Sequence, residues 1–356
     1  MSVYLSQRFS GFTPYVPGEQ PQDRSYIKLN TNESPFPPSP AVLAAINSDE
    51  TARLNLYPDP DARAVRLAIG VQFGVSPENI ILGNGSDELL AFAFQAYCDG
   101  GTPAVYADIT YGFYGVFARA NCVPSHIIPL DAAFNIVPSD YYGAGGTIFI
   151  ANPNAPTGLA LPLSAIEDIV RENRGNVVVV DEAYAAFGAR SATQLIHKYD
   201  NLIVVHTMSK SKNLAGARLG YAFADAGLIE DLNTMRCAFN PYNVNRLSLL
   251  AAGAAIGDSA YYDSCIDRII AIREDTAAAL SKRGFTVLSS KTNFLFARPG
   301  FTSGGDYYRG LKERGVLVRH FAQERIKDYV RISIGDACQM DALLAATDEM
   351  LLSHTG

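Results

Sequence analysis

Lys210 is the residue through which this chain could do covalent chemistry. It lies in the stretch 206–218, where an apolar run, 202–205, is followed by small and hydroxyl-bearing residues, two lysines and an arginine. A lysine held in an apolar cleft beside other cations loses proton affinity, and a neutral amine can form a Schiff base with an aldehyde. A solvated basic turn after a strand is the alternative, so the interpretation depends on the rest of the chain.

A second segment, 83–88, could bind an anion. Its sequence Gly-Asn-Gly-Ser-Asp-Glu follows a short apolar strand and opens a predicted helix. Glycines let the backbone approach an anion, and the N–H groups at a helix start can bind phosphate together with a serine hydroxyl. The alternative is a tight turn in which Ser86 or Asp87 caps the helix.

Asp181 ends the most apolar predicted strand, 177–180. A carboxylate at that position is costly unless it is paired, and the protonated ring nitrogen of a cofactor would pair with it. A helix cap or a magnesium ligand is the alternative. Tyr184 could place its hydroxyl near the same ligand, and the ring of Tyr111 could either stack on a flat ligand or belong to the core.

Two arginines and one loop complete the candidate residues. Arg331 lies within an apolar predicted strand, and Arg319 follows another, 316–318. A buried arginine needs an anion, which is either an internal acid or the carboxylate of a ligand. The loop 152–158 contains two prolines and a glycine, so it either presents an amide side chain rigidly or is simply a stiffened turn.

Composition argues against several classes of protein. The chain has 356 residues, a net charge of −7 and no run of lysines and arginines, which argues against a nucleic-acid surface. No apolar run is long enough to cross a membrane, and the N-terminus lacks the apolar segment of a signal peptide. The five histidines show no metal-ligand spacing, so no metal is expected. Five dispersed cysteines suggest reduced thiols and a cytoplasmic protein.

Repeated strand–helix units between residues 62 and 223 predict the α/β class. The predicted strands are continuously apolar, which is typical of a mostly parallel sheet with helices on both faces. Ligands bind at the carboxyl ends of such strands, where the candidate segments fall. Three parts are predicted: an extended, proline-rich arm over residues 1–40, a large domain over 41–255 and a smaller α+β domain over 256–356.

These segments, in this order, resemble the pyridoxal-phosphate-dependent aminotransferases of fold type I over nearly the whole chain. Within that superfamily the sequence is similar to the histidinol-phosphate aminotransferase family. The closer match is carried by the segments 14–18 (PYVPG), 28–35 (KLNTNESP), 57–59 (YPD), 85–88 (GSDE), 110–111 (TY), 181–184 (DEAY) and 241–245 (PYNVN). The resemblance implies pyridoxal 5′-phosphate as cofactor, a homodimer, and a large domain with a mostly parallel, seven-stranded sheet between helices.

The resemblance also implies a role for each candidate residue. Lys210 would be the catalytic lysine, which binds the cofactor as a Schiff base and then moves the substrate proton. Asp181 would bind the ring nitrogen, Tyr184 would bind the ring oxygen O3′, and Tyr111 would stack on the ring. The residues implied around the cofactor phosphate are Ser86, Asp87, Ser209, Arg218 and, from a neighbouring subunit, Tyr57. Those implied for the substrates are Arg331, for the α-carboxylate of glutamate or 2-oxoglutarate, and Arg319, Tyr15 and Asn32, near the substrate phosphate.

One position departs from the pattern of the family. The family has asparagine immediately before Pro-Thr-Gly, in contact with O3′, whereas this chain has Ala155 there. We therefore expect either that Asn154 makes this contact or that Tyr184 makes it alone. Lys212, two residues after Lys210, is expected to be a solvated or phosphate-facing charge.

The expected reaction interconverts L-histidinol phosphate plus 2-oxoglutarate and imidazole-acetol phosphate plus L-glutamate. An aromatic-amino-acid aminotransferase is the first alternative, because Phe12, Tyr15 and Tyr242 could line an aromatic pocket. A decarboxylase of phosphorylated amino acids with the same fold is the second alternative. A non-catalytic cofactor-binding module, like the aminotransferase-like half of some transcription regulators, is the third.

Overall fold

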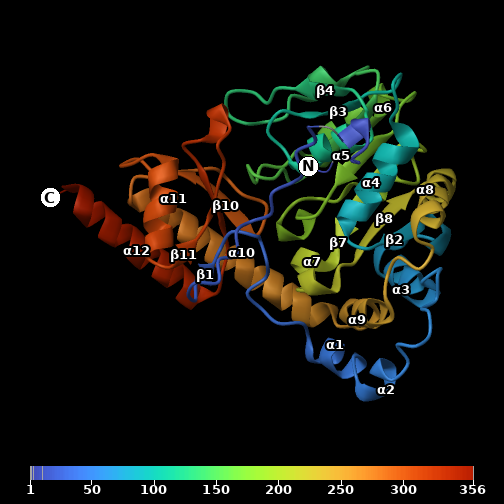
Figure 1. Ribbon diagram of the computed structural model, residues 1–356, viewed down its shortest axis with the longest axis horizontal. Coiled ribbons are helices and arrows are strands. Elements are labelled where there is room, and N and C mark those ends of the chain that lie inside the picture. The colour runs from blue at the N-terminus through green and yellow to red at the C-terminus, as the bar shows by residue number, and fades with distance from the viewer. Residues whose placement is uncertain (1, 3, 10, 356) are drawn as a thin grey trace.

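A seven-stranded sheet forms the larger part of the computed structural model, which describes residues 2, 4–9 and 11–355 (Figure 1). Its strands are β2 (Ile80–Gly83), β3 (Ala104–Ala107), β4 (Ser125–Ile128), β5 (Thr147–Ala151), β6 (Val178–Asp181), β7 (Leu202–Thr207) and β8 (Gly220–Ala224). They lie in the order β2-β8-β7-β6-β5-β3-β4. Only β8 runs antiparallel to its neighbours within this sheet, so the prediction of a mostly parallel, seven-stranded sheet is confirmed.

Helices cover both faces of this sheet, because successive residues of a strand point to opposite sides. Val178 and Val180 belong to one apolar core, and Val179 belongs to the other. The helices that contribute to the first core are α3 (Arg63–Phe73), α6 (Leu163–Glu172) and α9 (Arg246–Gly257). Those that contribute to the second are α4 (Ser86–Tyr97), α5 (Phe113–Ala120) and α8 (Ala226–Phe239). By the same alternation, Asp181 lies on the side of α4 and α5.

A four-stranded antiparallel sheet forms the smaller part of the molecule, in the order β12-β13-β10-β9. Its strands are β9 (Thr286–Val287), β10 (Phe294–Arg298), β12 (Arg319–His320) and β13 (Val330–Ser333). The accompanying helices are α10 (Ser259–Lys282), α11 (Gly304–Glu313) and α12 (Ala337–Thr355). Arg319 pairs with Arg331 in the register of β12 and β13. The two arginines that were predicted to bind substrates are therefore neighbours on adjacent strands.

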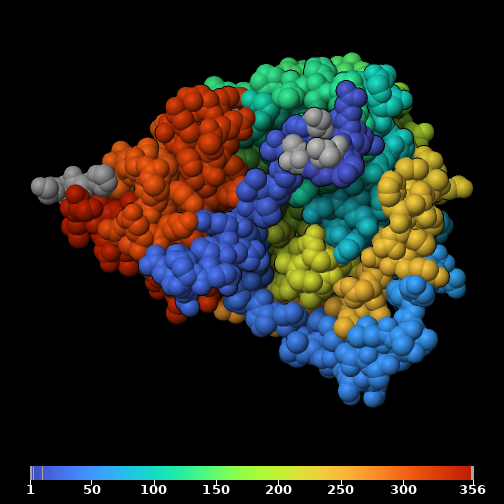
Figure 2. All heavy atoms as spheres, viewed as in Figure 1, coloured from blue at the N-terminus to red at the C-terminus, as the bar shows by residue number. Residues whose placement is uncertain are grey.

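The N-terminal segment crosses the molecule between these two parts (Figure 2). Its strand β1 (Ile27–Lys28) pairs in parallel with β11 (Val316–Leu317). Nearer the N-terminus, Tyr15 stacks on Phe113 of α5 with ring centroids 4.2 Å apart. Glu19 accepts hydrogen bonds from Tyr308 and Lys312 of α11. The segment thus contacts both parts before it enters α1 (Pro40–Ala45) and α2 (Ser48–Thr51).

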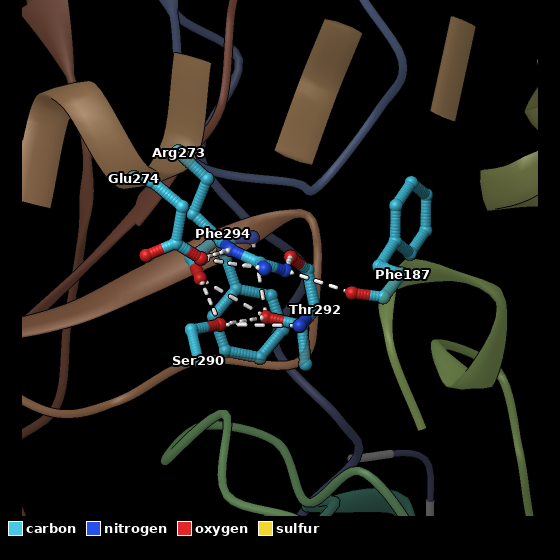
Figure 3. Close-up of polar contacts among 6 residues, drawn as sticks. All are labelled: Phe187, Arg273, Glu274, Ser290, Thr292 and Phe294. Carbon is cyan, nitrogen blue, oxygen red and sulfur yellow. Dashed lines mark hydrogen bonds and ion pairs between the residues drawn. The ribbon is translucent and has the colours of Figure 1, made fainter. Parts of the chain in front are cut away.

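Arg273 of α10 joins the two parts at a buried position (Figure 3). Its guanidinium donates hydrogen bonds to the carbonyl oxygens of Phe187, at 3.0 Å, and of Thr292, at 2.8 Å. Phe187 lies three residues after Tyr184, whereas Thr292 lies two residues before β10. A buried arginine that bonds two carbonyls is costly to disturb, since both acceptors would lose their partner. This contact therefore fixes the loop after β6 relative to the smaller sheet.

Three further observations concern the predicted exclusions. No helix in the described part of the chain is long and apolar enough to span a membrane. Among residues 2, 4–9 and 11–355, no group of three or more histidine, cysteine, aspartate or glutamate side chains could hold a metal ion. All five cysteines are free thiols.

Candidate active site

A cavity of about 390 Å³ lies where the ends of the central strands meet the smaller sheet and the N-terminal segment. A cavity of this size holds a small-molecule ligand. The predicted site residues that line it are Tyr15, Asn32, Ser86, Asp87, Tyr111, Asp181, Tyr184, Ser209, Lys210, Arg218, Arg319 and Arg331. Those from the large sheet meet because the carboxyl ends of β2, β6 and β7 and the start of β8 share one edge of the sheet, whereas Arg319 and Arg331 come from the smaller sheet.

Lys210 lies on α7 (Met208–Ser211), a short helix that begins where β7 ends. The side chain of Thr207 caps this helix by accepting a hydrogen bond from the Ser209 N–H at 3.1 Å. The Lys210 amine donates a hydrogen bond to the carbonyl oxygen of Thr31 at 3.1 Å. The helix cap and this hydrogen bond hold the amine at the wall of the cavity.

The environment of Lys210 favours its neutral form. Burial and the nearby Arg331 lower the pKa of Lys210 to about 8, while Glu33 and Asp87 oppose that shift. An amine with such a pKa is neutral in a useful fraction of molecules near neutral pH, and the neutral amine is the nucleophile and the base. The covalent chemistry expected from the sequence thus has a matching electrostatic setting.

One end of the cavity is built to bind an anion. Ser86 and Asp87 begin α4, whose first N–H groups have no carbonyl partner within the helix. The Arg218 guanidinium lies beside them, with a nitrogen 3.3 Å from the Asp87 carboxylate. Gly85 allows this approach, because a Cβ at that position would lie 2.6 Å from the guanidinium, and its φ of +85° favours glycine. Ser209 also lines the cavity.

Asp181 presents a buried carboxylate to the cavity. It is 5% exposed and accepts hydrogen bonds from the Tyr114 hydroxyl at 3.1 Å and from the Ala183 N–H at 3.2 Å. Burial raises the pKa of Asp181 to about 6, although these two hydrogen bonds oppose the shift. In the described part of the chain it has no ion-pair partner within 4.0 Å. A cationic group of a ligand would supply that partner.

Two tyrosines flank this carboxylate. The Tyr111 hydroxyl donates a hydrogen bond to Asp87 at 2.6 Å, which fixes its ring at the cavity wall. The Tyr184 hydroxyl accepts a hydrogen bond from the Asn32 amide at 2.9 Å. Among the described residues the Tyr184 hydroxyl has no acceptor for its own proton, so it can donate that proton to a ligand oxygen.

The guanidinium of Arg331 is incompletely paired. It donates one hydrogen bond to the carbonyl oxygen of Asn30 at 3.1 Å, and its Nε is buried with no partner in the described part of the chain. The rings of Phe294 and Phe321 lie 5.3 and 5.8 Å from the guanidinium carbon. Arg319 has different contacts: it donates to the carbonyl oxygens of Pro17 and Val16 at 3.1 and 3.2 Å. A ligand carboxylate would complete the pairing of Arg331.

Together these groups fit pyridoxal 5′-phosphate, the cofactor that the sequence resemblance implies. An amine of lowered pKa suits its aldehyde, a buried carboxylate suits its ring nitrogen, and a helix start with an arginine suits its phosphate. The partnerless Nε of Arg331 then remains for a substrate.

Comparison with known proteins agrees with this geometry. The model of the family "Aminotransferase class I and II" matches residues 24–346. A histidinol-phosphate aminotransferase from Marinomonas sp. (strain MWYL1) is 47% identical over 349 residues, which are 97% of this chain and 99% of that relative. The chain belongs to the histidinol-phosphate aminotransferase family. The expected family and fold type are thereby confirmed.

Other members of this family extend the comparison. The histidinol-phosphate aminotransferase from Brachyspira hyodysenteriae is 45% identical over 342 residues, covering 96% of this chain and 97% of that protein. The crystal structure of histidinol-phosphate aminotransferase from Sinorhizobium meliloti, in complex with pyridoxal-5′-phosphate, has a TM-score of 0.88 with this structure. It covers 99% of both chains at 24% sequence identity, so this likeness supports the fold.

Two predicted site residues, Asn154 and Tyr57, do not line the cavity, and of the two alternatives for O3′ this favours the one in which Tyr184 makes the contact without Asn154. Its amide donates to the carbonyl oxygen of Ile109 and to the hydroxyl of Thr157, both at 3.0 Å, and its oxygen accepts from Thr110 at 2.8 Å. All of its polar atoms therefore serve the loop. Tyr57 is 76% exposed and does not line the cavity of its own chain, and its contact with a neighbouring subunit stays a prediction.

The expectation for Lys212 is also corrected. The residue is 8% exposed, and its amine lies 4.9 Å from the ring centroid of Tyr262. Burial lowers the pKa of Lys212. It is neither a solvated charge nor one of the residues that line the cavity.

Sequence reasoning missed two contributions to the site. Thr31 accepts the hydrogen bond of Lys210 through its backbone, so its side-chain type carried no signal. Tyr114, three residues after Tyr111, lies on α5, which begins at Phe113, and its hydroxyl donates a hydrogen bond to Asp181. Its hydroxyl gave no signal of its own, because a tyrosine in an apolar helix is usually part of the core.

Proposed function

We propose that this protein is a pyridoxal-phosphate-dependent aminotransferase that converts L-histidinol phosphate and 2-oxoglutarate to imidazole-acetol phosphate and L-glutamate. The observation that carries the proposal is the cavity in which Lys210, Asp181 and the register-paired arginines meet. The names of relatives that are 45–47% identical over nearly the whole chain support the choice of substrate.

The residues around the ring have separate tasks in this proposal. The chemistry that pyridoxal 5′-phosphate supplies when bound is an aldehyde for the amino group and a ring that withdraws electrons. Lys210 would hold the aldehyde carbon through Nζ until the substrate amine displaces it, and the freed neutral amine would then move the proton between the substrate Cα and the cofactor carbon C4′. Asp181 keeps the ring nitrogen protonated, Tyr184 donates a hydrogen bond to O3′, and Tyr111 stacks on the ring. The free hydroxyl proton of Tyr184 supports its role without help from Asn154.

The remaining residues bind anions. Ser86, Asp87, Ser209 and Arg218 bind the cofactor phosphate, the first two mainly through backbone N–H groups. Those that bind the substrates are Arg331, for the α-carboxylate of glutamate or 2-oxoglutarate, and Arg319, Tyr15 and Asn32, for the phosphate of histidinol phosphate. Two adjacent arginines let one cleft accept both a dicarboxylate and a phosphate monoester, because both are anions.

The proposed division of labour follows the chain. The arm, 1–40, covers the cleft and excludes water from it, as supported by its contacts with both sheets. The large domain, 41–255, holds the cofactor. The small domain, 256–356, supplies Arg319 and Arg331.

The active unit of the proposal is a homodimer in which Tyr57 reaches the cofactor phosphate of the neighbouring subunit. Exposed apolar side chains around Tyr57 support this assembly: Leu54 and Leu56 are 56% and 52% exposed, and Tyr242, which is 40% exposed, stacks on Tyr57 at 4.4 Å. Contiguous exposed apolar side chains mark contact surfaces. The five free cysteines support a reducing compartment, so we place the dimer in the cytoplasm.

The test is a transamination assay with 2-oxoglutarate that compares histidinol phosphate with phenylalanine at matched concentrations. Faster glutamate formation from histidinol phosphate supports the proposal. Faster turnover of phenylalanine identifies an aromatic-amino-acid aminotransferase, and carbon dioxide release without 2-oxoglutarate identifies a decarboxylase. Of the three aromatic residues behind the first alternative, Phe12 and Tyr242 do not line the cavity, which favours histidinol phosphate.

A further inference from the structure

Tyr114 donates a hydrogen bond to the carboxylate that is proposed to hold the cofactor ring nitrogen. The hydroxyl oxygen of Tyr114 lies 3.1 Å from Oδ2 of Asp181. Tyr114 is 0% exposed and does not line the cavity, so it touches Asp181 from behind. In the described part of the chain this is the one hydrogen bond of its hydroxyl. Tyr114 can therefore act on a ligand only through Asp181.

Packing explains the ring of Tyr114 but not its hydroxyl. The ring lies among four other aromatic rings, with centroid distances of 5.7 to 6.4 Å; these belong to Phe94, Tyr106, Tyr111 and Phe149. Phenylalanine would fill the same space. A hydroxyl buried among these rings is costly unless it is bonded, and Asp181 supplies the bond. The hydroxyl thus points to a role that concerns Asp181.

We propose that Tyr114 is a positioning residue of the aminotransferase: its hydrogen bond keeps Asp181 an ionised carboxylate, in the orientation that holds the ring nitrogen of the cofactor. This inference rests on the proposed function, because it uses the role of Asp181 given there. Tyr114 bonds Oδ2 and the Ala183 N–H bonds Oδ1 at 3.2 Å, so the carboxylate cannot rotate freely. Each oxygen retains a lone pair for the cavity.

The charges around Asp181 make this hydrogen bond consequential. Burial raises the pKa of Asp181, the Tyr114 and Ala183 bonds lower it, Asp87 of α4 raises it, and His206 of β7 lowers it. Of these opposing groups, Tyr114 has the largest lowering effect. Without its bond the pKa rises above about 6, and a larger fraction of Asp181 is protonated near neutral pH. A protonated carboxyl group cannot stabilise a protonated ring nitrogen.

Tyr111 and Tyr184 are two further titratable groups near Asp181, and the amine of Lys210 lines the same cavity. Both tyrosines have a pKa raised above the ordinary value by burial, so both stay neutral through the pH range in which Asp181 titrates. A change in the acid limb of a pH profile in a Tyr114 variant therefore reports on Asp181 rather than on these tyrosines.

The experiment compares the wild-type holoenzyme with Tyr114→Phe and with a matched control, Tyr106→Phe. Tyr106 lies next to Tyr114, is also buried and also loses one hydroxyl bond, but that bond joins Ser125 at 2.8 Å. Two quantities are measured against pH: the fraction of cofactor retained after gel filtration, and kcat/KM. For Tyr114→Phe we expect the acid limb of each pH profile to move up by about one pH unit. At a pH on that limb, the affinity for the cofactor should be about tenfold lower than in the wild type. At alkaline pH, retention should match the wild type.

A second variant should shift the acid limbs in the opposite direction while keeping the size of the side chain. Fluorotyrosine at position 114 retains the ring and the hydroxyl but donates a stronger hydrogen bond, so the acid limbs should move down. An unchanged acid limb in both Tyr114 variants would overturn the inference, and so would an equal shift in Tyr106→Phe. These outcomes leave the proposed function intact, whereas a wild-type protein that retains no cofactor or transfers no amino group contradicts the function itself.

Discussion

The amine of Lys210 donates a hydrogen bond to the carbonyl oxygen of Thr31 at 3.1 Å, across 179 residues of chain. The N-terminal segment is therefore part of the site and not an appendage. The contacts of Arg319 with the carbonyl oxygens of Val16 and Pro17 reinforce this conclusion. A residue proposed to bind the substrate phosphate also holds the segment that covers the cleft, so substrate binding and covering of the cleft are coupled through one guanidinium.

Replacing Arg331 should mainly impair the reaction with the co-substrate 2-oxoglutarate. In Arg331→Met we expect kcat/KM for 2-oxoglutarate to fall by about 100-fold or more, because the carboxylate loses its buried charged partner. Arg331→Lys should restore only part of it, since lysine cannot bind a carboxylate with two parallel hydrogen bonds. Steady-state kinetics measure the effect, and Arg298→Met, at an exposed arginine of the same sheet, is the control. A change in Arg331→Met of less than about twofold would contradict the role of Arg331.

The charge of Lys210 should destabilise the cofactor-free fold at neutral pH. Its pKa is lowered from 10.5 to about 8, so the folded state disfavours the charged amine. The resulting loss of stability is complete below about pH 8 and disappears above about pH 10.5. Lys210→Met should therefore raise the free energy of unfolding by about 3 kcal/mol at pH 7, with the gain shrinking as pH rises. Chemical denaturation at several pH values measures it. A gain that grows with pH would refute the explanation.

Asn154→Ala should affect stability and not cofactor binding. The substitution removes three hydrogen bonds of a buried side chain, to Thr110, Ile109 and Thr157, and we expect the free energy of unfolding to fall by about 2–4 kcal/mol. Titration of the cofactor-free protein should give an affinity close to that of the wild type. Tyr184→Phe is the contrast, because it should weaken the affinity with little loss of stability. Weaker cofactor binding at unchanged stability in Asn154→Ala would show that Asn154 contacts the cofactor.

The sequence pattern predicted much of the fold where burial is uniform. The strands β5, β6 and β7 are buried along nearly all of their length, so their continuous apolar runs were visible. The strand β4 was not predicted, because three of its four residues are exposed at the edge of the sheet. Its pairing with β3 comes from the tertiary arrangement and not from local hydrophobicity.

The site could be predicted residue by residue but not as a geometry. Arg319 and Arg331 were each predicted as site residues, because each is a cation beside or within an apolar strand. Their position next to each other could not be predicted, because it depends on the register of β12 and β13. The two alternatives for O3′, Asn154 or Tyr184 alone, could not be separated from the sequence, because the one-residue step between Asn154 and Ala155 decides which side chain faces the cavity. The hydrogen bond between Tyr114 and Asp181 joins a helix to a strand, and no spacing in the sequence encodes it.

Mixing two inactive variants should restore activity if Tyr57 serves the neighbouring subunit. In a hybrid of Lys210→Ala and Tyr57→Ala subunits, one site has both Lys210 and a partner's Tyr57, whereas the other has neither. Random pairing makes half of the dimers hybrid, so the mixture should reach about a quarter of the wild-type activity. The assay follows co-expression of the two chains, with each variant alone as the control. Activity no greater than the average of the two separate variants would contradict the shared site.

The most direct test of the central claim is to find which amine holds the cofactor. The holoenzyme is reduced with borohydride, digested, and the peptide that carries the cofactor is identified by mass spectrometry. The cofactor should be found on Lys210, the amine of lowered pKa at the cavity wall. Lys212 is the internal control, because it lies two residues away, outside the cavity and against the ring of Tyr262. A label on Lys212 or on any other lysine, or no label in a protein that binds the cofactor, would contradict the account.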